Sequence, residues 1–436
     1  MKNHLEIREF DLITFNEEYK EDSQYKFLHE DNYNELKNFL LTYDQGDSSD
    51  TIDFFKISVL RNVGEIIQAK NYVGVIQLKS GFQIEILPKI HAVQQDDTRR
   101  IFLQMIRSLK DFPNKVFQSA NLRIDKMNLY EVFIHMYISE VLALVKKGLR
   151  SAYITVENNE NFFKGKLIFR EQMYRNLLHK ERFYVAYDEF HLNRAENRII
   201  KSTLLKLMQV SNSSKNKKMM RQLLAHFEMV EPSTNYDRDF SQVVIDRNTK
   251  NYELIIHWSQ IFLTNKSFAT FTEDTKARSL LFPMEKVFEA YVAKHLKITL
   301  SDLPWYVSTQ DNGHYLFESP RRFALRPDIV ITRDDGSKVI LDTKWKLLSN
   351  NPSRNYGISQ ADMYQMYAYS KKYDTPEIWL LYPMTDKVSD ENISYKAYEN
   401  NELEVSVSIF FVVVANITES LEKLKEYLVA GVYEER

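Results

Sequence analysis

Apolar residues recur at helical spacing in several stretches of this chain. Within residues 128–149 they occupy positions 129, 132, 133, 136, 137, 141, 144 and 145, which is the stripe of an amphipathic helix. The same spacing predicts helices at residues 98–110, 192–210, 216–228 and 252–263. Short apolar runs predict strands across residues 52–90 and near residues 152–156 and 166–169. The first 270 residues therefore have the pattern of an α+β region.

Two apolar runs near the three-quarter point of the chain flank an Asp334-Asp335-Gly336 turn. A turn of this kind between apolar runs is a strong short-range signal for a β-hairpin. If the hairpin centres on Asp335, Asp328 and Asp342 become cross-strand neighbours, roughly 5 Å apart at Cβ. The pattern therefore predicts a pair of carboxylates at the open end of the hairpin.

The residues that follow Asp342 extend this pair. Period-2 alternation places Lys344 on the face of Asp342, with Thr343 pointing away. Adjacent buried carboxylates repel, and they persist only with a shared proton, a cation or a metal. A hard cation such as Mg²⁺ with oxygen ligands is the natural occupant. The alternative is a surface hairpin whose acidic residues merely protect a sheet edge.

Helices are predicted on both sides of the hairpin. Residues 282–296 carry apolar side chains at positions 284, 287, 288, 291, 292 and 296, and Glu289 lies beside this stripe. In that position Glu289 directs a third carboxylate towards the hairpin, unless it is an ordinary solvated flank residue. Residues 361–369 predict a second helix with Gln365 and Tyr369 on one face, although an aromatic core helix would have the same spacing.

Pro327-Asp328 and Asp342-Thr343-Lys344 resemble the two halves of the PD-(D/E)xK nuclease motif. With Glu289 before them and Gln365 after them, they resemble the nuclease domain of the McrC family, the cleaving subunits of McrBC-type restriction systems for modified cytosine (5-methylcytosine). Further blocks resemble the same family in the same order: Tyr72–Leu78 with Ile84–Ile90, Gly165–Glu171, and Tyr187–Phe190 with Asn193 and Asn197-Arg198. The resemblance covers about residues 70 to 370.

The resemblance implies an α+β N-terminal and central region followed by an α/β domain of the PD-(D/E)xK restriction-endonuclease type. Asp328, Asp342 and the Thr343 carbonyl would hold Mg²⁺ or Mn²⁺. Glu289 would be a direct or water-mediated third ligand, and the number of metal ions, one or two, stays open. Lys344 would orient the attacking water or stabilise developing charge, and Gln365 would position the phosphate.

Glycine is scarce, with ten residues, and no Gly-x-x-x-x-Gly-Lys-[Ser/Thr] motif occurs. The chain therefore has no P-loop for nucleotide hydrolysis. The resemblance implies that a McrB-like AAA+ GTPase, expected as a hexameric ring, supplies the energy. This chain would bind and stimulate that motor through residues 1 to about 270 and would cleave double-stranded DNA. Two alternatives stay open: a non-catalytic cap that activates the motor, and a standalone nuclease.

Net charge varies along the chain and suggests three domains. A strand-rich domain, residues 1–105, carries −6, a basic middle region, residues 106–270, carries +9, and the nuclease domain, residues 271–436, carries −5. The basic residues of the middle region include Lys146, Lys147, Arg150, Lys164, Lys166, Arg170 and a run at 213–218 that reads as a basic loop. This surplus suits contact with the motor partner or with DNA. Residues 44–50 read as an acidic loop and residues 270–275 as a linker.

Cysteine is absent from the sequence, which excludes disulfides and thiolate metal sites and leaves oxygen or histidine ligands. The first residues are too charged for a secretory signal, and the longest apolar run, Ile409–Ala415, is too short to span a membrane. We therefore expect a cytoplasmic enzyme without a membrane partner.

Overall fold

The computed structural model describes residues 4–43, 54–90, 95–110, 112, 127–247, 249–264, 278–385, 393–399 and 402–434. The chain forms two compact units. Residues 1–114 and 274–436 make up unit 1, and residues 115–273 make up unit 2. The N-terminal and C-terminal thirds of the sequence thus belong to one unit, with the middle third inserted between them. The expected acidic loop at 44–50 and linker at 270–275 lie outside the described residues.

The N-terminal part of unit 1 is rich in strands, as the short apolar runs predict. One four-stranded sheet has the order β3-β2-β5-β4, and another has the order β1-β7-β6-β11. The elements are β1 (His4–Arg8), β2 (Leu12–Thr14), β3 (Tyr25–Phe27), α1 (Glu30–Tyr43), β4 (Phe55–Leu60), β5 (Gly64–Ala69), β6 (Tyr72–Gln77), β7 (Gln83–Leu87) and α2 (Gln95–Ile106). The strand β11 (Arg278–Pro283) comes from the far side of unit 2 in the sequence and completes the second sheet by antiparallel pairing with β6.

Gly74 in β6 lies within one of the sequence blocks that resemble the family, and the structure explains why it is glycine. Its φ is +138°, and a Cβ at this position would lie 1.9 Å from the carbonyl oxygen of Leu280 on β11. A contact that short is impossible, so only glycine lets the two strands pair here.

The C-terminal part of unit 1 is built on a six-stranded mixed sheet with the order β12-β15-β16-β17-β19-β18. Its strands are β12 (Tyr306–Thr309), β15 (Ile329–Thr332), β16 (Lys338–Thr343), β17 (Glu377–Pro383), β18 (Ile393–Glu399) and β19 (Glu402–Val412). A separate hairpin, β13 (Tyr315–Glu318) and β14 (Arg321–Ala324), follows β12. The helices are α9 (Met284–Thr299), α10 (Gln360–Tyr373) and α11 (Ile417–Glu434), and the first two confirm the helices predicted around the hairpin.

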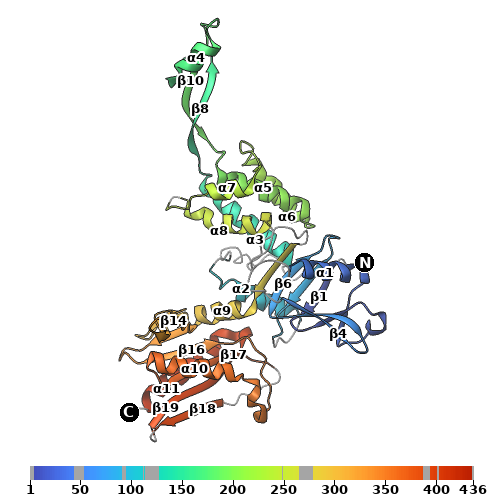
Figure 1. Cartoon of the computed structure of the whole chain (residues 1–436), viewed down its shortest axis with the longest axis vertical. Helices are drawn as coiled ribbons and strands as arrows, with labels where there is room; N and C mark the ends of the chain where they lie inside the picture. The colour runs from blue at the N-terminus through green and yellow to red at the C-terminus, as the bar shows by residue number, and fades with distance from the viewer. Residues whose placement is uncertain are drawn as a thin grey trace. The chain divides into compact units, whose positions relative to one another are not determined.

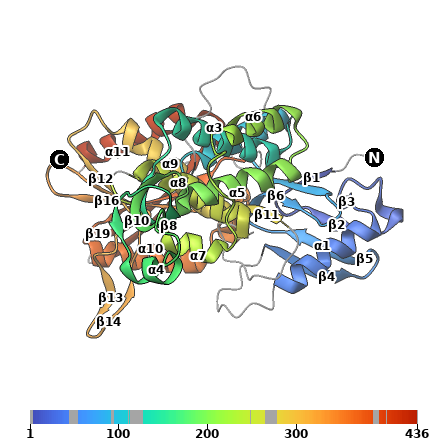
Figure 2. The ribbon, with the colours of Figure 1, turned by 90° about the horizontal axis from the view of Figure 1, so that it is seen from above.

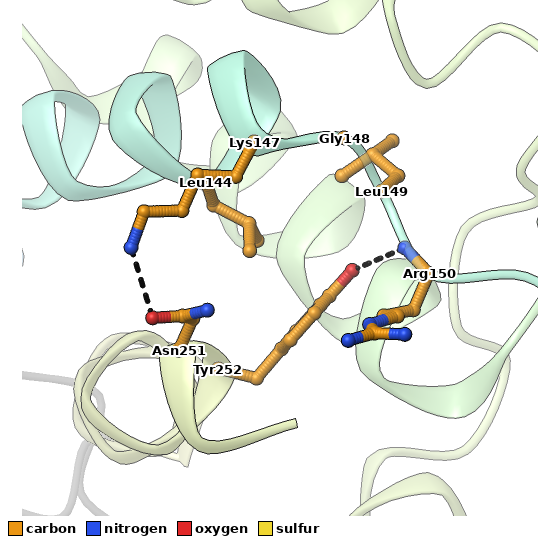
Figure 3. Close-up of a pocket in the computed structure, with 7 residues that line it drawn as sticks. All are labelled: Leu144, Lys147, Gly148, Leu149, Arg150, Asn251 and Tyr252. Atoms are coloured by element: carbon orange, nitrogen blue, oxygen red, sulfur yellow. Dashed lines mark hydrogen bonds between the residues drawn. The ribbon is translucent and has the colours of Figure 1, made fainter. Parts of the chain in front are cut away.

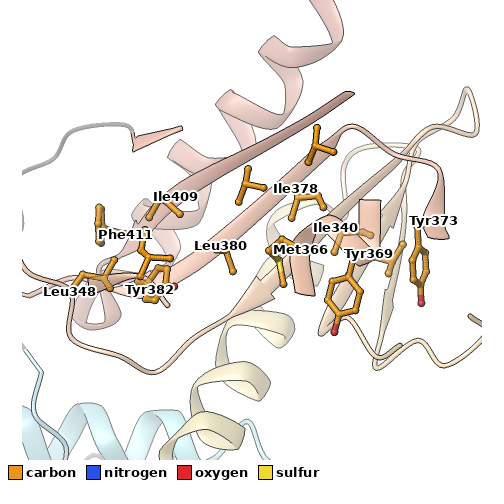
Figure 4. Packing of buried hydrophobic residues seen from close by; sticks show 14 residues of the cluster. Ile340, Leu348, Met366, Tyr369, Tyr373, Ile378, Leu380, Tyr382, Ile409 and Phe411 are labelled. Carbon is orange, nitrogen blue, oxygen red and sulfur yellow. The ribbon is translucent and has the colours of Figure 1, made fainter. Parts of the chain in front are cut away.

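Apolar side chains from the sheet and from α10 form the core of the C-terminal part of unit 1 (Figure 4). Ile340, Ile378 and Leu380 are fully buried on neighbouring strands, and Met366 reaches them from α10. Tyr369 and Tyr373 lie on the same helix, at the edge of this cluster. The core therefore fixes α10 against the strands that carry the predicted carboxylates.

Unit 2 combines a group of helices with a long β-ribbon, in which a short strand pairs beside one of two long strands. The helices are α3 (Leu129–Lys147), α5 (Ala195–Val210), α6 (Ser214–Ala225), α7 (Tyr236–Gln242) and α8 (Lys250–Thr264). The ribbon consists of β8 (Ala152–Glu160), β9 (Lys166–Leu167) and β10 (Phe183–His191), with α4 (Phe169–Arg175) at its far end (Figure 1). The sequence did not predict β10, because Asp188 and Glu189 interrupt any apolar alternation on it.

The basic run at 213–218 is not the loop that its composition predicts. Ser213 caps α6 by accepting a hydrogen bond from the Asn216 amide, and the helix begins at the next residue. Asn216 is fully buried and donates to the side chain of Glu131 on α3. This buried polar contact holds the segment as a helix, and such a long-range contact leaves no local signal.

No helix in the described part of the chain is long and apolar enough to cross a membrane.

A buried carboxylate links the two ends of unit 1. Glu9, which follows β1, accepts hydrogen bonds from the Trp345 indole Nε1 at 3.0 and 3.1 Å and from the Lys89 amide at 3.0 Å. Burial raises the pKa of the Glu9 carboxyl to about 8, although these hydrogen bonds and the Lys89 charge lower it. Trp345 also packs against Phe288 of α9, with ring centroids 5.3 Å apart. Glu9 thus holds the residue directly after Lys344.

We predict that Glu9→Ala lowers the free energy of unfolding by about 2–4 kcal/mol, because it leaves the buried Trp345 N–H and the Lys89 amide without an acceptor and opens a cavity. Glu9→Gln keeps one acceptor oxygen and should cost less. Denaturant unfolding followed by tryptophan fluorescence measures both. Glu18→Ala, at an exposed position nearby, is the control, and an equal effect of Glu9→Ala and Glu18→Ala would contradict the prediction.

Candidate active site

The predicted hairpin forms with the predicted register. Ile329 faces Leu341, and Thr332 faces Lys338. In both pairs the two residues lie equally far in sequence from Asp335, as a turn centred on that residue requires. Gly336 supplies the positive φ, +85°, that the turn requires. Asp328 lies one residue before β15, and Asp342 is 2% exposed near the end of β16. The two carboxylates are therefore held at the open end of the hairpin.

Thr343 does not point away from this site as strand alternation predicts. Its backbone N–H and its hydroxyl donate to the same oxygen of Asp328, Oδ2, at 2.8 and 2.6 Å. The reason is that Asp328 precedes the first paired residue of β15, so the alternation of the strand does not govern its side chain. Thr343 thus orients the first carboxylate of the motif.

Lys344 joins the second carboxylate to α10. Its Nζ lies 2.7 Å from Asp342 Oδ2 and donates to Gln365 Oε1 at 3.0 Å. Gln365 Nε2 in turn donates to the Tyr369 hydroxyl at 2.7 Å, which confirms that the two side chains share a helix face. Gln365 therefore positions the lysine, and one of its two amide hydrogens remains for another acceptor.

Glu289 of α9 faces the same group of charges. It is partly buried and accepts a hydrogen bond from Gln310, the residue directly after β12. Burial and the negative charge of Asp328 raise the pKa of Glu289 to about 7. The electrostatic effect of Asp328 requires that the two carboxylates lie near each other, so Glu289 is not a solvated flank residue.

Like charges meet at this site. Burial raises the pKa of Asp328. Burial and the charge of Asp328 raise the pKa of Asp342, and the ammonium of Lys344 only partly offsets them. For Lys344, burial lowers the pKa, but the carboxylates of Asp342 and Asp362 outweigh it and the pKa is raised. The three carboxylates of Asp328, Asp342 and Glu289 therefore outnumber the two lysines that lower their pKa values, Lys344 and Lys286.

The donor set fits a hard cation. Asp328, Asp342 and Glu289 offer only oxygen atoms. Burial raises all three pKa values, and the charge of Asp328 adds to this for Asp342 and Glu289, so a bound cation would stabilise their charged forms. Within the described residues, however, no three acidic, histidine or cysteine side chains are close enough together to hold a metal directly. This geometry fits direct ligation by the two aspartates, with Glu289 acting through water.

Two residues of the site were not predicted from the sequence. Gln310 binds Glu289, and its backbone N–H donates to the Asp328 carbonyl at 3.0 Å. Asp362 on α10 lies 4.0 Å from Lys344 Nζ and accepts from Lys346 Nζ at 2.7 Å. Asp362 has a local signal, since it lies one turn before Gln365 on the predicted helix. Gln310 has none, because only the return of β12 beside β15 brings it to the site.

A cavity of about 330 Å³ lies elsewhere, in unit 2, and contains none of the predicted site residues (Figure 3). It lies where α3 ends and α8 begins. Tyr252 accepts from the Arg150 amide at 2.8 Å, and Lys147 donates to Asn251 at 3.0 Å. The polar groups of this cavity thus bind one another.

Comparison with known proteins places the chain in a family. The profile of the family described as "McrBC 5-methylcytosine restriction system component" matches residues 67–383. A search of curated proteins found no match.

Two solved structures from Thermococcus gammatolerans resemble the fold. One is a half-complex from a tetradecameric assembly of McrB AAA+ hexamers with bound McrC. A chain of it matches with a TM-score of 0.69 at 19% identity, covering 98% of this chain and 100% of that chain. A chain of the McrBC complex, determined by cryo-electron microscopy, matches with a TM-score of 0.51 at 21% identity, covering 68% and 88%.

The family profile covers both halves of the carboxylate motif and the three sequence blocks that precede it. It confirms the resemblance found in the sequence. The chain belongs to the family of McrBC 5-methylcytosine restriction system components.

Proposed function

We propose that this chain is the DNA-cleaving subunit of a GTP-driven, modified-cytosine-specific restriction complex. It would hydrolyse phosphodiester bonds in a Mg²⁺-dependent reaction and stimulate an AAA+ GTPase partner. The observation that carries the proposal is the meeting of Asp328, Asp342 and Lys344 at the open end of one hairpin. A decayed nuclease fold, serving only as a cap, would have no reason to keep this costly group of buried charges.

The mixed sheet with α9 and α10 supports a PD-(D/E)xK nuclease domain. Both halves of the motif lie on adjacent strands, β15 and β16, and β16 continues in parallel pairing with β17. Glu289 reaches the site from α9 and Gln365 from α10. The motif residues are thus brought together by the sheet and by the two helices packed beside it.

The side chains have distinct roles in the proposed reaction. Thr343 fixes Asp328, and Asp342 fixes Lys344, so both carboxylates are oriented before substrate binds. Lys344 has three N–H donors and uses two of them on Asp342 and Gln365. In the described part of the chain the third has no hydrogen-bond partner, since Asp362 is 4.0 Å away, and it can hold the attacking water or the phosphate oxygen on which charge develops. Glu289, with a pKa of about 7, can exchange a proton with a water near neutral pH.

Asp328, Asp342 and the Thr343 carbonyl would hold Mg²⁺, with Glu289 as the outer ligand. When bound, the ion would supply positive charge for the phosphate and lower the pKa of a coordinated water.

The far end of the ribbon in unit 2 offers a surface for the motor. We call it the ribbon tip. Its exposed apolar side chains are Phe162, Phe163, Phe169, Met173, Tyr174, Leu177 and Leu178, and the last is 89% exposed. So many exposed apolar groups on one short segment mark a protein contact. The similar Thermococcus assembly contains McrB AAA+ hexamers with bound McrC, and this chain has no P-loop. We therefore assign the ribbon tip to the GTPase partner.

Contacts between distant segments decide which protein can be used to find the residues that bind the motor. We expected residues 1 to about 270 to engage the motor, and a fragment ending there would test it. Such a fragment would lack β11, which pairs with β6, and Trp345, which binds Glu9. Point variants of the full chain are the sounder test.

Asp342→Asn and Lys344→Ala should each lower the rate of DNA cleavage by about 10²–10⁴-fold, because each removes a charge that acts on the reacting phosphate or water. The assay is cleavage of methylated plasmid DNA with the GTPase partner, GTP and Mg²⁺. Asp334→Asn, at the exposed turn of the same hairpin, is the matched control. Near-normal cleavage by the Asp342→Asn protein would refute the site.

Binding of Mg²⁺ should strengthen with pH. Burial raises the pKa of Asp342 to about 7, so the folded protein holds a proton that the unfolded chain has lost. Without metal, the contribution of this group to stability is therefore full only below its ordinary pKa of 3.8, declines as pH rises above that value, and is lost once pH passes about 7. Mg²⁺ competes with that proton, and its apparent affinity should rise about tenfold between pH 6 and pH 8. Calorimetric titration tests this, and the same affinity at both values would contradict it.

Tyr174→Ser with Leu178→Ser should abolish stimulation of GTP turnover and leave the fold intact, because both side chains are exposed. Phosphate release by the partner is the readout. Met229→Ser with Val244→Ser, which alters exposed apolar residues elsewhere in unit 2, is the control. Equal stimulation by both double variants would remove the ribbon tip from the interface.

A further inference from the structure

The hairpin of β13 and β14 stands apart from the six-stranded sheet. It is inserted between β12 and β15, and it pairs with neither of them. Figure 2 shows it projecting beyond the rest of the C-terminal part of unit 1. Nearly every residue of its two strands is exposed. The hairpin therefore contributes nothing to the core of the domain.

Both ends of this hairpin are fastened at the carboxylate site. On the entering side, Gln310 binds Glu289 and donates its backbone N–H to the Asp328 carbonyl. On the leaving side, the chain reaches Asp328 four residues after β14 ends. The Leu325 amide donates to the His314 carbonyl at 2.9 Å and closes the base of the hairpin. Whatever binds the hairpin is thus held next to the proposed reaction centre.

The surface of the hairpin combines aromatic and cationic groups. Phe317 and Phe323 are 56% and 72% exposed, and their rings meet edge to face with centroids 5.9 Å apart. Arg321 and Arg322 are exposed on the same hairpin. Its acidic residue, Glu318, lies 3.5 Å from Lys372 of α10 and is balanced by it. The hairpin therefore presents net positive charge.

Phe323 adds a sign of a specific role. Its φ is +58°, in the left-handed region, which is a costly conformation for a bulky side chain. Such strain is kept where a side chain must be presented in one direction. The ring of Phe323 is presented to solvent, so burial of an apolar side chain cannot explain the strained backbone.

We propose that the β13–β14 hairpin is a DNA-binding element that enters a groove of the duplex beside the scissile phosphate. Arg321 and Arg322 contact phosphates, and the ring pair of Phe317 and Phe323 contacts the bases. The width of the major groove admits a two-stranded ribbon, and cationic side chains supply the salt-dependent part of the affinity. This inference rests on the proposed nuclease function, and its occupant is double-stranded DNA because the charge of the hairpin is complementary to phosphate.

The test measures DNA binding in the full-length Asp342→Asn protein, so that cleavage does not interfere. Fluorescence anisotropy with a labelled DNA duplex is recorded over a series of salt concentrations. Arg321→Ala with Arg322→Ala should weaken binding at least about tenfold and reduce the slope of log affinity against log salt by about 2, because two phosphate contacts are lost. Arg321→Lys with Arg322→Lys should restore the slope. Phe317→Ala with Phe323→Ala should weaken binding and leave the slope unchanged.

Lys396→Ala with Tyr398→Ala is the matched control. It removes an exposed cation and an exposed aromatic ring from β18, which lies at the edge of the six-stranded sheet opposite β12, the strand that precedes the hairpin. The proposal is overturned if the hairpin variants bind DNA like the control, or if the parent protein binds no DNA. It is also overturned if the hairpin variants lose only the GTPase partner, because the hairpin would then be a protein contact. Cleavage by the wild-type protein is assayed separately, and its failure would refute the nuclease function without deciding what the hairpin binds.

Discussion

The register between β15 and β16 is the constraint on which the site depends. Side chains alternate along a strand, so a slip of one residue would turn Asp342 to the opposite face of the sheet. The apolar residues beside it prevent this slip, because Ile340 and Ile378 are fully buried in the core that α10 covers. Burial of these apolar side chains thus holds the Asp342 carboxylate at a position where its own loss of hydration is unfavourable.

The remaining contacts of the site compensate for that desolvation. Lys344 supplies an opposite charge at 2.7 Å, and Gln365 and Tyr369 hold the lysine from α10. Residues outside the site also support it. Trp345, which follows Lys344, is held by the buried Glu9 and packs against Phe288, the neighbour of Glu289. The N-terminal strands therefore help to position both sides of the site, which explains why they share one compact unit with it.

The chain separates its two kinds of exposed apolar surface. The ribbon tip in unit 2 presents seven exposed apolar side chains beside exposed basic residues such as Lys166 and Arg170, whereas the β13–β14 hairpin pairs two phenylalanines with two arginines. Apolar groups alone bind best to other apolar groups, but phosphates require cations. The larger exposed apolar surface of the ribbon tip, and the attachment of the hairpin beside the carboxylate site, are the physical basis for assigning them to different partners.

The sequence by itself determined the local features of this protein. The apolar alternation around Asp335 predicted the hairpin and its register, and helical spacing predicted α9, α10 and the shared face of Gln365 and Tyr369. Only the tertiary structure decided the contacts between distant segments: Glu9 with Trp345, Gln310 with Glu289, and Thr343 turned towards Asp328. Periodicity reports which face of an element is buried, but it carries no information about which distant segment covers that face. For that reason the carboxylates could be predicted from the sequence, whereas the groups that hold them in place could not.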